Sequence, residues 1–169
     1  NCFKKSIWIN KIKLIECVPN FSEGVDESII KEITHEISSV NNVTLLYVDP
    51  GKDTNRTVVT FIGTPDKVIS AAFLAIKKAA ILIDMTKHKG EHPRMGATDV
   101  CPLIPITGVS MDECVKYSHQ LAKKVADELN ISVFLYEESA SNAKRKNLSN
   151  IRKGEYEGMQ EKLQTKEWI

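Results

Sequence analysis

The chain has 169 residues, of which 42% are hydrophobic and 27% are charged, and its formal net charge is +1. This composition fits one soluble domain with a substantial core, and it excludes the strong positive field expected of a protein that binds nucleic acid or an acidic membrane. Four widely spaced cysteines contain no Cys-x-x-Cys pair, which argues against a zinc ribbon and a disulfide scaffold. We therefore expect a cytoplasmic protein with neither nucleic acid nor membrane as a partner.

Residues 1–12 are predicted to be an N-terminal extension. The first ten residues are basic and then briefly apolar, and the apolar run is too short for a signal sequence or a membrane span. The chain also lacks an initiator methionine, so we interpret this segment as a trimmed or fragmentary extension.

The next segment predicts a strand followed by a helix. A β-like run over residues 13–18 stops at Pro19, which cannot continue a strand ladder as a donor. Apolar residues then recur at helical spacing from Ile29 to Val40, after a candidate N-cap at Asp26. The chain therefore starts with the order β-α.

Two strands and a second helix are predicted next. Residues 43–49 and 57–63 are rich in β-branched side chains and flank a Pro-Gly-Lys-Asp loop that is longer than a tight hairpin. Thr64 offers an N-cap and Pro65 fits the first helical position, ahead of an apolar stripe from Val68 to Ala79. These elements extend the predicted order to β-α-β-β-α.

An irregular insert precedes the last predicted elements. Within it, the run Cys101–Pro105 is interpreted as an edge segment rather than a thiol site, since no base stands beside Cys101 in the sequence. Ser110–Glu113 has the capping-box pattern that opens a helix ending near Leu129, and Ile131–Tyr136 is predicted to be a strand. The whole order suits an α+β fold in which an open sheet carries its helices on one face.

The stretch Gly90–Gly96 combines an acid, an imidazole and a guanidinium between two glycines. Glycine adopts positive φ at little cost, and Pro93 disfavours a helical conformation at His92. Because histidine titrates near neutral pH, His92 is a candidate general acid and base between Glu91 and Arg94. The alternative is a structural turn without catalytic function.

Several longer segments resemble a known family. The run 83–105 closely resembles the N-terminal subdomain of glutamate formiminotransferase. Residues 16–24, 54–58 and 154–157 resemble the opening motif of that family, the motif after its first hairpin and its closing motif, in the same order. The resemblance extends from about Leu14 to about Trp168, which identifies residues 13–169 as a member of this subdomain family.

The resemblance implies a fold and a reaction. The expected fold is a ferredoxin-like open sheet, and the expected reaction transfers the formimino group of N-formimino-L-glutamate to nitrogen five of tetrahydrofolate, in histidine catabolism and one-carbon metabolism. Tetrahydrofolate would act as a co-substrate, and no metal or redox cofactor would be required. His92 matches the catalytic histidine of the family and is expected to transfer protons to and from the reacting nitrogens.

Other polar residues at predicted strand ends are candidates for substrate binding. The carboxylate of Asp49 is suited to the cationic formimino nitrogens, and an arginine can grip a substrate carboxylate with a bidentate fork. Local turn chemistry is an equally open interpretation for the Asp and Asn residues. The candidates are Asn20, Asp49, Asn55, Arg56 and Arg94.

One rival motif overlaps the same loop. His88–His92 satisfies the His-x-x-Glu-His pattern of inverted zinc peptidases, in which both histidines lie on one helix and bind the metal. Gly90 weakens such a helix and Pro93 disfavours helical geometry at the second histidine. The sequence therefore argues against a metal site.

The resemblance stops where a second subdomain of similar fold would begin in the family. Two alternatives follow. In the first, the chain is half of a transferase, and a C-terminal subdomain or a second copy of the chain completes the cleft. In the second, the chain is a stand-alone, non-catalytic folate-binding or interaction module.

Overall fold

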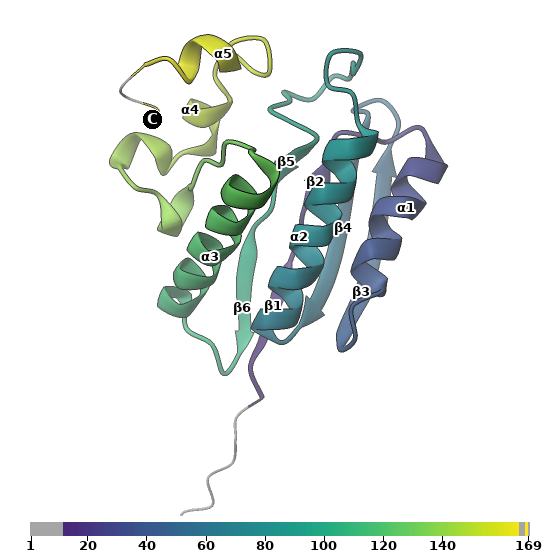
Figure 1. The fold of residues 1–169 in the computed structure, drawn as a ribbon, viewed down its shortest axis with the longest axis vertical. Helices are drawn as coiled ribbons and strands as arrows, with labels where there is room; N and C mark the ends of the chain where they lie inside the picture. Colours follow the sequence, from purple (N-terminus) through teal and green to yellow (C-terminus); the bar gives the residue numbers. More distant parts are fainter. Residues whose placement is uncertain (1–11, 166–167, 169) are drawn as a thin grey trace, which may run out of the picture.

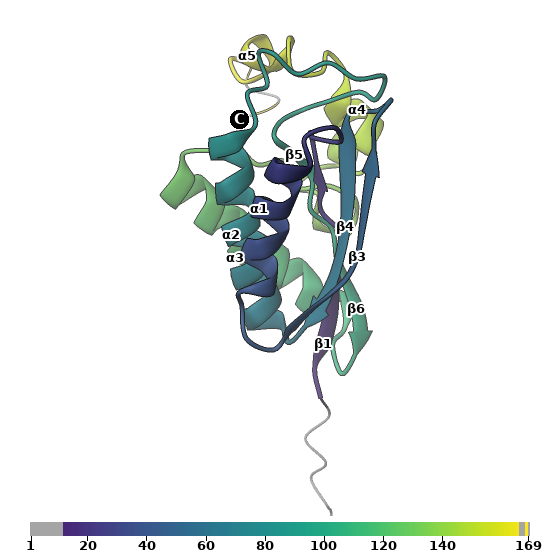
Figure 2. The same ribbon diagram turned by 90° about the vertical axis from the view of Figure 1, so that its right-hand side faces the viewer.

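A computed structural model describes residues 12–165 and residue 168, and it has an α+β architecture in which one antiparallel sheet is covered by helices on one face (Figures 1 and 2). Most of the predicted extension at residues 1–12 lies outside the described residues. The strands of the described sheet are β1 (Leu14–Cys17), β2 (Asn20–Phe21), β3 (Val43–Gly51), β4 (Arg56–Gly63), β5 (Thr98–Val100) and β6 (Leu103–Thr107). The α-helices are α1 (Glu27–Ser38), α2 (Pro65–Leu82), α3 (Met111–Leu129), α4 (Leu148–Arg152) and α5 (Met159–Lys162).

Strand β4 organises the sheet. It pairs with β3 along one edge and with β1 and then β2 along the other, and β6 and β5 continue the sheet beside β1 and β2. Pro19 separates β1 from β2, as its ring predicts, and its carbonyl accepts a hydrogen bond from Val59 N at 3.0 Å. The two short strands therefore run as one interrupted line beside β4.

The helices begin where the sequence predicts them. Asp26 caps α1, with its carboxylate accepting from Ser28 N at 2.8 Å, and Pro65 occupies the first turn of α2. Ser110 and Glu113 form the reciprocal capping box of α3, with N···O distances of 3.2 and 2.9 Å. The predicted start of each long helix is confirmed.

Alternation along β4 separates the two faces of the sheet. Thr57, Val59 and Phe61 are buried beneath the helices, while Arg56 and Val58 point to the opposite face. Helices α1, α2 and α3 all lie on the first side (Figure 2). The predicted placement of the helices on one face is confirmed, and the opposite face, here called the open face, carries Arg56.

The predicted strand at Ile131–Tyr136 is wrong. After α3 the chain turns at Asn130, whose φ is 56°, and residues 131–136 then make no strand ladder. Phe134 packs edge to face against Trp168, with ring centroids 5.9 Å apart. β-propensity forms a strand only where a neighbouring backbone is in register, and this segment has none. The α+β class holds, and a ferredoxin-like topology is not confirmed because the closing strand is absent from the described residues.

The insert before α3 contains two short strands that its sequence pattern does not predict. Strands β5 and β6 lie within residues 98–107 and pair with β2 and β1. Pro105 lies in β6, whose ladder partner is β1, so the proline occupies an edge strand. The prediction of an edge segment at Cys101–Pro105 is confirmed.

Candidate functional site

The loop that carries His92 is not helical. Residues 88–97 form bends and irregular backbone, so the helix that the inverted zinc motif requires does not form. The two histidines also have different partners, since His88 Nε2 contacts Asn55 O at 2.8 Å while the His92 ring contacts Arg56. This local structure follows from Gly90 and Pro93, as the sequence predicts.

Gly90 is needed because two backbones meet there. A Cβ at position 90 would collide with the carbonyl oxygen of Thr54 in the β3–β4 turn, whereas a Cβ at Gly96 would find its nearest neighbour at 3.8 Å. Glu91 N donates to Asp53 O at 3.2 Å across the same contact. The loop therefore rests directly on the β3–β4 turn.

Asn55 connects three loops. Its Oδ1 accepts from Gly24 N at 2.9 Å, its Nδ2 donates to Lys89 O at 2.9 Å, and its carbonyl accepts from His88. The residue has a φ of 47°, a conformation that asparagine tolerates better than most residues. Its side-chain amide is therefore engaged in holding the loops next to Arg56.

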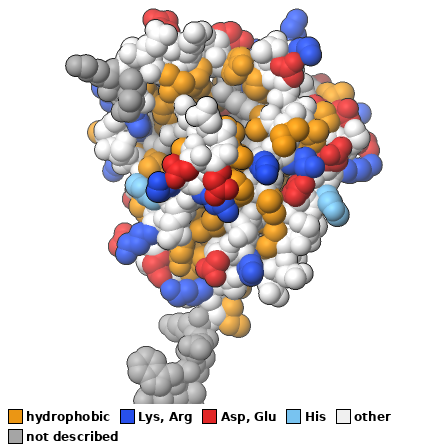
Figure 3. All heavy atoms as spheres, viewed as in Figure 1, with side chains coloured by type: hydrophobic (Ala, Val, Ile, Leu, Met, Phe, Trp, Pro, Cys, Tyr) orange, Lys and Arg blue, Asp and Glu red, His pale blue; other side chains and the backbone are white. Residues whose placement is uncertain are grey.

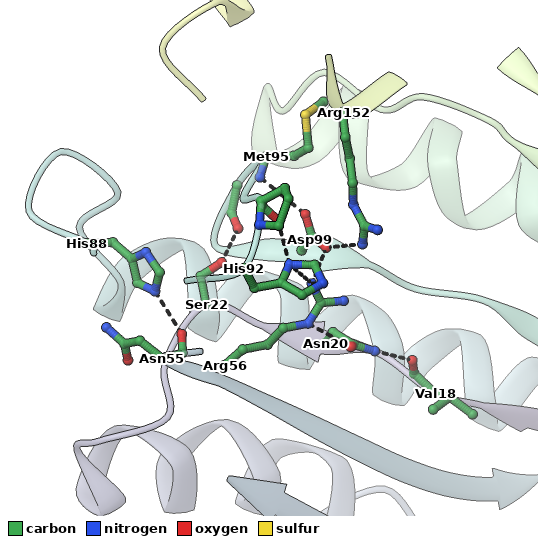
Figure 4. Close-up of polar contacts among 12 residues, drawn as sticks. Val18, Asn20, Ser22, Asn55, Arg56, His88, His92, Met95, Asp99 and Arg152 are labelled. Atoms are coloured by element: carbon green, nitrogen blue, oxygen red, sulfur yellow. Dashed lines mark hydrogen bonds and ion pairs between the residues drawn. The ribbon is translucent and has the colours of Figure 1, made fainter. Parts of the chain in front are cut away.

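Arg56 lies at the centre of the cluster (Figure 4). Its Nε donates to Asn20 Oδ1 at 2.8 Å, and its Nη1 lies 2.7 Å from Asp99 Oδ2. The same Nη1 lies 2.7 Å from His92 Nδ1 and 3.0 Å from His92 Nε2. Asn20 is itself oriented by donation from Nδ2 to Val18 O at 3.0 Å. The guanidinium of Arg56, which comes from β4, thus contacts side chains from β2, from β5 and from the loop that carries His92.

The ring of His92 lies against both Pro93 and Arg56. Its Nδ1 lies 2.6 Å from Pro93 O, and because a carbonyl only accepts, a hydrogen bond there requires Nδ1 to be the donor. Arg56 Nη1 lies 2.7 Å from Nδ1 and 3.0 Å from Nε2, so the guanidinium contacts both ring nitrogens. The imidazole therefore contacts the guanidinium of Arg56 and the backbone of Pro93, its own neighbour in the loop.

A buried carboxylate balances the positive charge. The side chain of Asp99 is 1% exposed, and it contacts Arg56, Arg152 Nη2 at 2.5 Å and the backbone N of Met95 at 3.1 Å. Burial lowers the pKa of Arg56, although a guanidinium remains protonated at neutral pH. Two guanidinium groups around one carboxylate leave this corner of the open face with net positive charge.

Asp49 and Arg94 lie outside this cluster. Asp49 is exposed on β3, and its register partner on β4 is Val58. On the other side of β4, the register partner of Val58 is Asn20 on β2. Residues in register share a face, so Asp49 lies on the open face across β4 from Asn20. The fork of Arg94 holds both carboxylate oxygens of Glu157, at 2.6 and 3.1 Å.

Sequence reasoning missed two members of the cluster. Asp99 stands inside the segment that resembles the family, but nothing in its neighbours predicts a buried charge. Arg152 precedes the closing motif at Gly154 by two residues and reaches Asp99 from α4. The available signal was their position in or beside family motifs.

Comparison of the sequence with known proteins identifies its family. Residues 14–169 match the sequence profile of the formiminotransferase domain, N-terminal subdomain. The chain belongs to this family. It is 54% identical over 92% of its length to a formimidoyltransferase-cyclodeaminase of Dictyostelium discoideum and 53% identical over 93% to that of Rattus norvegicus.

A shorter relative carries only the transferase in its name. The glutamate formimidoyltransferase of Streptococcus pyogenes serotype M1 is 47% identical over 92% of this chain. The chain spans 29% of the length of the Dictyostelium and rat relatives and 52% of the Streptococcus relative. Among the described residues of this formiminotransferase subdomain, none of the helices has the length and apolar character needed to span a membrane.

Proposed function

We propose that this chain supplies one wall of the active site of a glutamate formimidoyltransferase, which moves the formimino group from N-formimino-L-glutamate to tetrahydrofolate. The observation that carries the proposal is His92, held against Arg56 on the open face of a subdomain with a relative named as this transferase. Residues 13–169 would form the N-terminal subdomain of that enzyme, which would act in the cytoplasm.

The chemistry requires proton transfer at two nitrogens. Nitrogen five of tetrahydrofolate attacks the amidine carbon, a tetrahedral intermediate forms, and the glutamate nitrogen leaves after protonation. The Nε2 lone pair of His92 would accept the proton of the attacking nitrogen and return it to the leaving nitrogen. A substrate N–H group would approach Nε2 in place of the present contact with Arg56 Nη1.

The charges of the open face suit the substrates. Asp49 is exposed on the same face of the sheet as Asn20, and Asn20 and His92 both contact Arg56. The carboxylate of Asp49 would therefore stabilise the cationic formimino nitrogens. The positive corner around Arg56 and Arg152 would attract the carboxylates of the glutamate or folate. Arg94 would take this role only if a substrate carboxylate displaced Glu157.

The roles proposed for the two asparagines differ. Asn20 would orient the guanidinium of Arg56. Asn55 would hold the loops together rather than contact substrate, since its Oδ1 and its Nδ2 are each hydrogen-bonded to the backbone of a neighbouring loop. A non-catalytic folate-binding or interaction module is not favoured, because the relatives are named as transferases.

The test is formimino transfer by a protein that carries this chain together with the rest of the transferase unit of its relatives. We expect tetrahydrofolate-dependent consumption of N-formimino-L-glutamate, with formation of 5-formiminotetrahydrofolate. A folded two-subdomain protein that binds both substrates and transfers nothing would contradict the proposal.

A further inference from the structure

Two cysteines from neighbouring strands lie almost in contact. Cys17 ends β1, Cys101 follows β5, and their Sγ atoms are 3.5 Å apart. Val18 N donates to Pro102 O at 3.3 Å, which ties the two backbone segments together beside the thiols. Because a disulfide needs an S–S distance of about 2.05 Å, the two sulfur atoms would have to approach by about 1.5 Å.

We propose that Cys17 and Cys101 form a reversible disulfide by thiol–disulfide exchange with a small disulfide of the glutathione class. The site is separate from the proton-transfer chemistry proposed for His92 and is independent of that proposal. Cys114 is also buried, but the structure places no second cysteine beside it among the described residues.

The two thiols differ in access. Cys17 is fully buried, whereas Cys101 is half-buried and lines a cavity of about 990 Å³ bounded by α3 and residues 131–139. Burial raises the pKa of the Cys17 thiol, so this group is protonated at neutral pH and is a poor first nucleophile. Cys101 is therefore the entry point for the small disulfide.

The exchange balances in two steps. The thiolate of Cys101 attacks one sulfur of the small disulfide, which forms a mixed disulfide and releases one small thiol. Cys17 Sγ then attacks Cys101 Sγ, its proton passes to the leaving small thiolate, and the second small thiol is released. The two protein thiols lose two electrons in total, and the small disulfide is reduced to two thiols.

The cross-link would join the two segments that position Arg56. Cys17 precedes Asn20 by three residues, and Cys101 follows Asp99 by two, while both Asn20 and Asp99 contact Arg56. The cross-linked residues are also 84 positions apart, so the bond would restrict the unfolded chain. Oxidation should therefore raise the melting temperature of the chain.

The experiment incubates the native chain with mixtures of oxidised and reduced glutathione, alkylates the remaining thiols, and maps the peptides by mass spectrometry. We expect a cross-linked Cys17–Cys101 peptide pair that lacks two hydrogen atoms and is reversed by dithiothreitol. Cys17→Ser should accumulate a glutathione adduct on Cys101, while Cys101→Ser should leave Cys17 unmodified. The matched control Cys114→Ser should retain the cross-link.

Thermal melting by circular dichroism provides a second readout. Oxidised wild type and oxidised Cys114→Ser should both melt at a higher temperature than their reduced forms, and Cys101→Ser should show no such difference. The inference is overturned if peptide mapping of folded wild type finds both thiols free under oxidising conditions, or finds the cross-link only in denaturant. Mapping of the wild type decides the question even if a variant fails to fold.

Discussion

Asp99 shows how one buried charge organises the candidate site. Its carboxylate separates two guanidinium groups that would otherwise repel each other, and in doing so it fixes Arg56 toward Asn20 and His92. A buried carboxylate with two cationic partners and a backbone donor is fully engaged, so its role is to position Arg56 rather than to contact substrate.

We predict that Asp99→Ala lowers the free energy of unfolding by about 3–5 kcal/mol, because it leaves Arg56 and Arg152 without their shared partner. Urea denaturation of the isolated chain measures this loss. The matched control is Asp127→Ala, which removes an exposed pair with Lys123 and should cost about 0.5 kcal/mol. Similar losses in the two variants would contradict the burial argument.

At the scale of elements, the contact between the His92 loop and the β3–β4 turn depends on a glycine. Gly90→Ala places a Cβ against the carbonyl of Thr54, so the two backbones must separate and the hydrogen bond from Glu91 N to Asp53 O must weaken. We predict that the amide of Glu91 exchanges with solvent at least about tenfold faster in this variant. Gly96→Ala, which meets only an ordinary contact, should leave that exchange rate unchanged.

The start of α3 is a second element whose stability has a local cause. Ser110→Ala removes the side-chain acceptor for Glu113 N and half of the capping box. We predict a loss of about 1 kcal/mol in the free energy of unfolding, measured by thermal or urea denaturation. Ser132→Ala, at an exposed position outside any helix, should change the stability by less than about 0.5 kcal/mol.

These elements show what the sequence can and cannot predict. The start of each long helix was predictable because Asp26, Pro65 and Ser110 act on their own first turns, and β4 was predictable from β-branched residues in alternation. The segment Ile131–Tyr136 has equal β-propensity but lacks a ladder partner, which is a tertiary property.

The candidate site divides in the same way. His92 and Arg56 could be selected from family motifs, and Gly90 and Pro93 predicted a non-helical loop. The ion pair between Asp99 and Arg152 joins residues 53 positions apart, so only the folded chain reveals it. For the same reason the pairing of Arg94 with Glu157 was not visible in the sequence.

At the scale of the whole molecule, α1, α2 and α3 lie on one side of the sheet (Figure 2). Asn20 and Arg56 face the other side, since they alternate with the buried Phe21 and Thr57 along their strands. On the helix-covered side, basic and acidic side chains are interspersed, as the net charge of +1 suggests (Figure 3). The open face also exposes apolar side chains, including Ile104, whose register partner is Glu16 on β1. A polar site on one bare sheet face suits a cleft that needs a second wall.

We predict that the isolated chain folds and yet binds reduced folate far more weakly than a two-subdomain form. The described core is continuous, whereas an open sheet face leaves much of a ligand in water, where each charged contact contributes little. Calorimetric titration of both forms with 5-formyltetrahydrofolate measures the difference. Equal affinities would show that this chain, alone or as a pair of copies, builds the whole site.

The proposed role of His92 is tested by measuring the kcat of formimino transfer in a two-subdomain form that carries His92→Ala. Loss of a single general acid and base should lower kcat by about 10²- to 10⁴-fold. The matched control His119→Ala changes an exposed histidine on α3 and should retain the wild-type rate. A kcat near wild type in the His92→Ala protein would remove His92 from the mechanism.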